Sequence, residues 1–167
     1  MDPDDAAAYS ATLDEQLPAF IDLHRQMIGS ALDGIDEDEA RLRLVPSATT
    51  LLGLVKHATF VERVWFGEAV TGRSRADLGL VAGPEASFEL APEDTIDTVT
   101  AGHRRAVEQS RAAVAGLGLD AVLLGNRRGP LPLRWVYLHV LRELAQHCGH
   151  ADILREQILE QRGPVGT

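Results

Sequence analysis

Apolar residues recur at spacings of three and four along four long stretches of the chain, and this spacing is the period of an amphipathic helix. The pattern predicts helices over residues 11–32, 47–71, 92–117 and 132–161. Ser47 is a residue type that caps helices, and Pro92 is one that suits a first helical turn. Pro18 falls inside the first stretch, so we expect the regular helix there to begin close to it.

Each predicted helix has an apolar face that needs a neighbour to cover it. The face of the first helix contains Leu13, Leu17, Phe20, Met27 and Ala31. The face of the last helix contains Val136, Val140, Leu144, Ala151, Leu154 and Ile158. Four such helices predict an all-α fold, a four-helix bundle, in one domain over residues 1–167.

The stretches between the predicted helices contain glycine and proline. Residues 73–91 form a connection long enough for a crossover between the second and third helices. A weak alternating pattern, the only strand signal in the chain, covers residues 86–90. We therefore expect a helical fold with at most one short strand.

Polar residues interrupt the apolar faces of the second and last helices. His147 lies at the centre of the last face, and Glu143, four residues earlier, lies at its edge. His57 lies among apolar residues of the second helix, at a depth close to that of His147 if the two helices are antiparallel neighbours. A buried carboxylate needs a partner. A divalent ion, an arginine from another helix and a proton shared with a histidine are the alternatives that the pattern leaves open for Glu143.

Other histidines lie near this predicted cluster. His139 and His150 flank it on the last helix and are candidates for a pocket wall, where an imidazole can orient a ligand or carry a proton. His24 and His103 lie on the apolar faces of the first and third helices, where they would pack as core histidines or line a polar cavity. Cys148 is turned away from the predicted cluster, so we expect a buried structural thiol.

Composition limits the partners. The 25 acidic against 16 basic residues give a net charge of −9, which disfavours nucleic acid and anionic membranes as partners. No apolar run is long enough for a transmembrane helix. The start, MDPDDAAAYS, is acidic where a signal peptide is basic, and the single cysteine suits a reducing compartment. We expect a cytoplasmic protein with a small-molecule partner, in which Trp65, Phe66, Trp135 and Tyr137 pack the core or a homodimer contact.

Two segments resemble the DinB/YfiT-like superfamily. They are LLGLVKH with VERVWF, over residues 51–57 and 61–66, and LHVLRELAQHCGHADILRE, over residues 138–156. They resemble the second and last helices of that superfamily, and within it the actinobacterial branch of unassigned function related to mycothiol-dependent maleylpyruvate isomerase. The resemblance covers nearly the whole chain and implies a bundle with up-down-down-up topology.

The resemblance also implies a metal site. The matching positions are His57, Glu143 and His147, and glutamate stands at the middle position in the isomerase branch, where many other members have histidine. Two imidazoles and a carboxylate suit zinc, nickel or ferrous iron. The implied function is a metal-dependent transferase or isomerase that uses a thiol such as mycothiol as co-substrate. The alternative is a non-catalytic bundle that binds a metal or a small ligand.

Overall fold

The computed structural model describes residues 9–162, so the acidic start of the chain and both ends of the predicted domain lie outside the described residues. Four helices are long: α2 (Leu13–Ser30), α4 (Leu51–Glu62), α6 (Ile96–Val114) and α7 (Leu133–Gln161). The shorter elements are α3 (Glu37–Ala40), the π-helix η1 (Arg63–Glu68), α5 (Ala69–Thr71) and the 3-10 helix η2 (Glu85–Phe88). The prediction of a mostly helical fold is confirmed.

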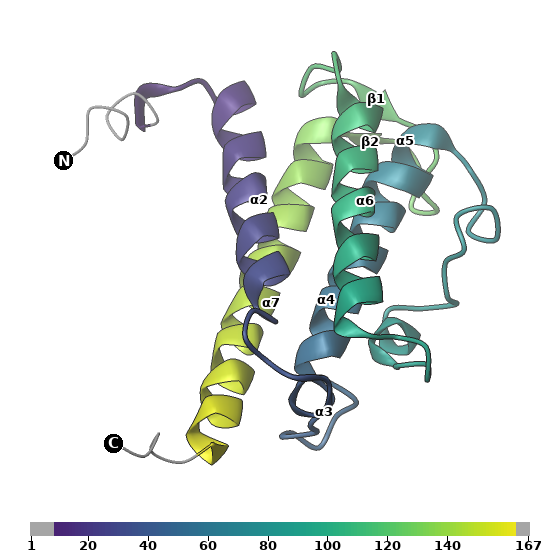
Figure 1. Cartoon of the computed structure of the whole chain (residues 1–167). Helices are drawn as coiled ribbons and strands as arrows, with labels where there is room; N and C mark the ends of the chain where they lie inside the picture. Colours follow the sequence, from purple (N-terminus) through teal and green to yellow (C-terminus); the bar gives the residue numbers. More distant parts are fainter. Residues whose placement is uncertain (1–8, 163–167) are drawn as a thin grey trace.

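The long helices lie side by side (Figure 1). α2 packs along α7, α4 packs along both α6 and α7, and α2 also touches α4 and α6. In Figure 1 the chain runs downward in α2 and α7 and upward in α4 and α6. The connection from α5 to α6 therefore returns along the length of the molecule, and it contains η2.

Two helices begin later than the sequence pattern predicts. α4 begins at Leu51 because the Thr50 hydroxyl accepts the backbone N–H of Gly53 at 3.0 Å, whereas the Ser47 hydroxyl donates to Thr49. α6 likewise begins after Thr95 rather than near Pro92. In both places a threonine directly before the apolar run provides the cap that satisfies the first backbone donors.

The predicted start of the first helix is also corrected. α2 begins at Leu13, where the Glu15 carboxylate accepts the backbone N–H of Thr12 at 2.9 Å. Pro18 lies inside α2 and does not mark its beginning. The capping glutamate fixes the start of the helix more strongly than the proline does.

The buried face of α2 differs from the predicted face. Leu13, Phe20 and Met27 are 57%, 52% and 41% exposed. Leu17 and Ala31 are buried as predicted, but the other buried residues of α2 are Ile21, Arg25 and Ile28. The sequence pattern did not indicate this face because the face contains a charged residue, Arg25. Arg25 is buried only because another helix supplies its acidic partner.

A short hairpin was not predicted. β1 (Val122–Leu123) pairs antiparallel with β2 (Leu131–Pro132), while the predicted strand at residues 86–90 is occupied mainly by η2. Two-residue strands are too short to show an alternating pattern. At Gly125, an added Cβ would lie 2.1 Å from the carbonyl oxygen of Glu68, so only glycine allows the hairpin to pack this closely against the end of η1.

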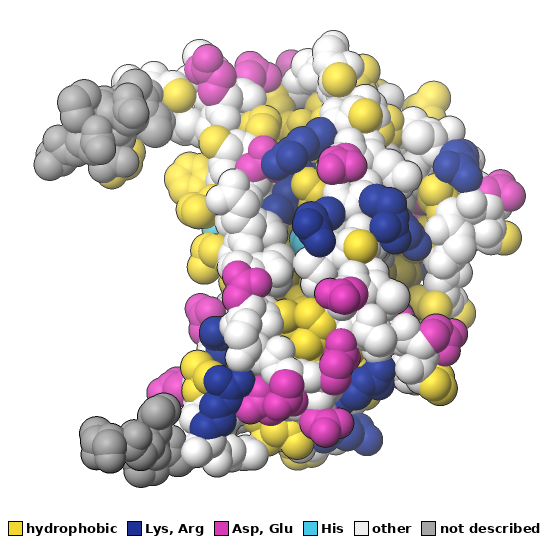
Figure 2. Space-filling view, in the orientation of Figure 1, with side chains coloured by type: hydrophobic (Ala, Val, Ile, Leu, Met, Phe, Trp, Pro, Cys, Tyr) yellow, Lys and Arg dark blue, Asp and Glu magenta, His cyan; other side chains and the backbone are white. Residues whose placement is uncertain are grey.

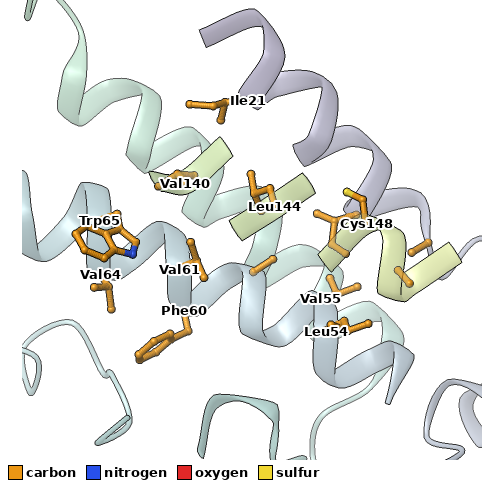
Figure 3. Packing of buried hydrophobic residues seen from close by; sticks show 14 of the residues in the cluster. Ile21, Leu54, Val55, Phe60, Val61, Val64, Trp65, Val140, Leu144 and Cys148 are labelled. Carbon is orange, nitrogen blue, oxygen red and sulfur yellow. The ribbon is translucent and has the colours of Figure 1, made fainter. Parts of the chain in front are cut away.

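The apolar core lies between α2, α4 and α7. Figure 3 shows Ile21 of α2, Val61 of α4 and Val140 and Leu144 of α7 among its side chains. Every residue predicted for the apolar face of the last helix is buried. Within residues 9–162, no helix combines the length and the apolar character needed to cross a membrane.

A buried ion pair joins α2 to α4 within this core. Arg25 donates from Nε to Oε1 of Glu62 at 2.8 Å and from Nη2 to Oε2 at 2.7 Å. Nη1 donates to Asp22 at 2.8 Å, and the guanidinium lies 5.3 Å from the centre of the Phe66 ring. Burial alone would lower the pKa of Arg25, but the bonds to Glu62 and Asp22 outweigh burial and raise the pKa. Every polar atom of the Glu62 carboxylate thus has a cationic partner.

Candidate metal centre

The structure brings His57 of α4 together with Glu143 and His147 of α7. One donor atom from each side chain lies within 4.8 Å of the other two. Oε2 of Glu143 is 3.7 Å from Nε2 of His147, and the centres of the two imidazole rings are 4.6 Å apart. The contact between α4 and α7 places the three side chains at one depth, as the helical pattern predicts.

A hydrogen bond fixes which nitrogen of His57 faces the cluster. The buried hydroxyl of Ser87 donates its only proton to the carbonyl oxygen of Pro84 at 2.5 Å. The same hydroxyl lies 2.6 Å from Nδ1 of His57, so it accepts the Nδ1 proton. In the neutral ring Nε2 then carries the lone pair that a metal ion needs.

The segment that carries Ser87 reaches α4 because of a glycine. A Cβ on Gly53 would lie 2.8 Å from the carbonyl oxygen of Phe88, so a larger residue would push η2 away from the helix. The Phe88 ring stacks on His57, with centres 4.0 Å apart and planes 11° apart. Sequence reasoning missed Ser87. The signal that could have found it is Gly53 itself, an isolated helical glycine one turn before His57, which is typical of close backbone approach.

His147 has an unused ring nitrogen. Its Nδ1 is buried and has no hydrogen-bond partner within residues 9–162, and its Nε2 faces the Glu143 carboxylate. Burial lowers the pKa of His147, and it lowers the pKa of His57 to about 4, with a further contribution from the His147 charge. Both imidazoles are therefore neutral near pH 7 and keep a lone pair for an electrophile or a metal ion.

Glu143 remains ionised despite its partial burial. Burial would raise the pKa of this carboxyl group, but the hydrogen bond from Arg142 and the neighbouring His139 outweigh burial and lower the pKa. Nη2 of Arg142 donates to Oε1 at 2.8 Å, and Nε2 of His139 lies 3.7 Å from the same oxygen. The second oxygen, Oε2, is left facing His147.

A cavity of about 530 Å³ opens beside the cluster. His57, Glu143 and His139 contribute to its wall, together with apolar side chains of α4 and η1 that include Phe60 and Trp65. His139 is held between two tryptophans, at 4.1 Å from the Trp65 ring and stacked on Trp135 at 5.0 Å. The predicted pocket residue His139 thus lies at the cavity, and two of the three donors, His57 and Glu143, line the same cavity.

The π-helix η1 shapes one side of this cavity. Val64, Trp65 and Glu68 all lie in η1 and all line the cavity. A π-turn widens the helix by one residue per turn, and such turns are frequent at functional sites. The helical period alone predicts no such change, because the apolar positions of this stretch fit an ordinary α-helix.

The other predicted histidines lie elsewhere. His150 is exposed and does not line the cavity, although its ring lies 5.7 Å from that of His147. His103 lines a separate groove between α2 and α6, on the face seen in Figure 2, and the groove is also lined by arginine side chains. Nδ1 of His24 bonds to the carbonyl oxygen of Phe20 at 2.7 Å. These residues therefore do not share one polar cavity with the cluster.

Cys148 is buried, as predicted. Its Sγ donates to the carbonyl oxygen of His24 at 3.5 Å. Burial, with the nearby Asp152 charge, raises the pKa of the thiol to about 11. Cys148 is thus a protonated packing residue near pH 7, and it is not among the three donors.

A mostly helical chain that places a His-Glu-His cluster between two of its helices has the architecture expected of a DinB-like protein. The family model described as mycothiol-S-transferase matches residues 16–159, and the chain therefore belongs to the mycothiol-S-transferase family. This confirms the resemblance to DinB-like proteins related to mycothiol enzymes. A comparison with curated proteins found no match.

Proposed function

We propose that this chain is a divalent-metal-dependent transferase that joins a thiol of the mycothiol class to a small electrophile. The observation that carries the proposal is the convergence of His57, Glu143 and His147 beside a cavity whose wall includes His57 and Glu143. The family match supports the choice of thiol.

The three side chains suit a metal ion both in the type of donor atom they offer and in their protonation states. The Ser87 contact leaves Nε2 of His57 free, Glu143 is ionised, and His147 has neutral ring nitrogens. Three protein ligands leave open positions for a substrate, as in catalytic zinc sites. Zinc, nickel and ferrous iron all fit this donor set.

A divalent ion held by these residues would supply a Lewis acid that lowers the pKa of a thiol. In the proposed reaction the thiol sulfur forms a bond with the electrophilic carbon, the displaced group leaves with the electron pair of the broken bond, and the thiol proton passes to solvent. Phe60 and Trp65 give part of the cavity an apolar wall, along which the carbon part of the electrophile would lie.

His139 has a positioning role in this proposal. Arg142 donates to Nδ1 of His139 at 3.3 Å, so the neutral ring carries its proton on Nε2, the nitrogen that faces Glu143. A ring whose acceptor nitrogen is already occupied is not free to act as a base. His139 and Arg142 thus hold the carboxylate, a common arrangement around metal ligands.

Metal analysis and a transfer assay test the proposal. Wild-type protein is expected to bind about one Zn²⁺, Ni²⁺ or Fe²⁺ per chain and to form mycothiol adducts only when loaded, whereas His57→Ala is expected to lose both properties. Binding of metal without adduct formation over a panel of electrophiles would favour the non-catalytic alternative. Absence of metal binding, or adduct formation equal with and without metal, would contradict the proposal.

Several further features belong to the proposal as predictions. The helix directions in Figure 1 support the up-down-down-up bundle, in one domain over residues 1–167, that the resemblance implies. The cytoplasmic location, the homodimer contact, the absence of nucleic-acid partners and the role of His150 also stay predictions. The isomerase reaction, in which the thiol adds to the substrate and then leaves again without a net adduct, also stays a prediction.

A further inference from the structure

The cavity beside the candidate metal centre is lined by positive charge. Four arginines line it, Arg75, Arg127, Arg128 and Arg142, against two carboxylates, Glu68 and Glu143. The local balance is therefore 4 − 2 = +2, in a chain whose net charge is −9. An excess of cations at a concave site in an acidic protein favours an anionic ligand.

Three of the four arginines have acidic partners. Nε of Arg75 donates to Glu68 at 3.0 Å, and Nε of Arg127 lies 3.9 Å from the same side chain. Arg142 donates to Glu143 at 2.8 Å. The guanidinium of Arg128 has no acidic or hydrogen-bonding partner in the part of the chain that the structure describes, and it is the cation left for a ligand.

Arg128 is nevertheless held in place. Its backbone N–H donates to Oδ1 of Asn126 at 2.9 Å, which fixes the turn between β1 and β2, and Asn126 is itself buried. The guanidinium lies 5.5 Å from the centre of the Trp65 ring. An arginine that packs on an aromatic ring keeps its N–H groups available at its edge, and this fork matches the two oxygens of a carboxylate.

We propose that the electrophile used by this enzyme carries a carboxylate, and that Arg128 binds it. This inference rests on the proposed transferase function and adds a substrate class to it. The apolar part of the electrophile lies along Trp65 and Phe60, which line the same cavity as Glu143 and His57. Arg128 sets specificity, and the thiol chemistry takes place at the cluster.

A pair of isosteric electrophiles tests the proposal: a chloronitrobenzoate and the matching chloronitrobenzamide, with mycothiol and Zn²⁺-loaded protein. In both, the thiol sulfur bonds to the ring carbon, chloride leaves with the electron pair of its bond, and the thiol proton passes to buffer. The measured quantity is the ratio of kcat/KM for the benzoate to that for the benzamide, each divided by the uncatalysed rate. We expect Arg128→Gln to lower this ratio about tenfold, mainly through KM.

Two further variants sharpen the test. Arg105→Gln removes the same charge from an exposed position on α6 that does not line the cavity, and it is expected to keep the wild-type ratio. Arg128→Lys keeps the charge without the planar fork and is expected to give an intermediate ratio. A ratio in Arg128→Gln equal to that of the wild type would overturn the proposal, because the carboxylate would then bind elsewhere, for example to the metal alone.

A binding measurement separates this proposal from the proposed function. Nitrobenzoate and nitrobenzamide lack the leaving group, so calorimetric titration measures their affinities without any reaction. Tighter binding of nitrobenzoate, reduced about tenfold in Arg128→Gln, would support the carboxylate site even if no adduct formed with either electrophile. Equal affinities for the two compounds would overturn it even in an active transferase.

Discussion

Two polar clusters lie in the interior of this protein, and they differ in how completely they are satisfied. In the Arg25–Glu62 pair, both carboxylate oxygens accept a bond from one guanidinium, and Asp22 takes a third nitrogen. In the His57–Glu143–His147 cluster, donor atoms face one another at 3.7 to 4.8 Å and no proton is shared between them. The first cluster is closed, and the second is open to a cavity.

The difference separates a structural role from a functional one. A buried carboxylate is tolerated when charge-assisted hydrogen bonds replace its water, which is what Arg25 does for Glu62. Lone pairs that converge without such bonds are what the proposed metal site would use. The same residue type, glutamate, thus serves packing at position 62 and a candidate metal site at position 143.

The largest expected effect comes from the closed pair. Glu62→Gln removes the charge that compensates Arg25 in the core, and we expect the free energy of unfolding to fall by about 3 kcal/mol. For a chain of this size that corresponds to a decrease in Tm of roughly 6 to 12 °C. Thermal denaturation of the metal-free protein measures it. An unchanged Tm would mean that the ion pair does not stabilise the fold.

The same substitution in the open cluster is expected to act on metal binding. Glu143→Gln removes a partly exposed carboxylate, so the metal-free protein should lose about 1 kcal/mol of stability or less. The dissociation constant for Zn²⁺ should rise by about 100-fold or more, because the anionic carboxylate donor becomes a neutral amide. Competition with a chromogenic chelator measures this constant. If Glu143→Gln lowers Tm as much as Glu62→Gln does, Glu143 stabilises the fold as Glu62 does, and the proposed difference between the two clusters is wrong.

A smaller effect is expected from the residue that orients His57. Ser87→Ala removes the acceptor for the Nδ1 proton, and we expect the Zn²⁺ dissociation constant to rise about tenfold. Ser87→Thr keeps the hydroxyl and serves as the matched control. Wild-type affinity in Ser87→Ala would show that the tautomer of His57 is set by the metal alone.

The sequence predicts the open cluster better than the closed one, for a physical reason. His57 and His147 lie at the centre of long apolar faces, so the helical period alone indicates that they are buried. Arg25 and Glu62 give no such signal, since each looks like a surface charge until a distant helix supplies its partner. The same dependence explains why Leu13, Phe20 and Met27 were wrongly predicted for the buried face of α2.

The helical pattern of the sequence did not predict the residues that surround the site. Ser87 of η2 reaches His57, and Arg128 of the β1–β2 turn reaches the cavity, along paths set by close approaches at Gly53 and Gly125. Such contacts join segments far apart in the chain, and neither a helical period nor a cap signals them. The widening at η1 likewise depends on packing.

The smallest expected effect concerns Cys148, which follows His147 directly in the chain but is a buried packing residue and not one of the three donors. Because burial raises its pKa to about 11, the thiol is protonated throughout the range from pH 6 to pH 9 and should resist iodoacetamide in the folded protein. Labelling should become fast only in denaturant, or as the pH approaches the raised pKa. Cys148→Ala is expected to leave the Zn²⁺ dissociation constant unchanged, which separates it from its neighbour His147. A weaker affinity in this variant would place the sulfur in the open cluster and change its donor set.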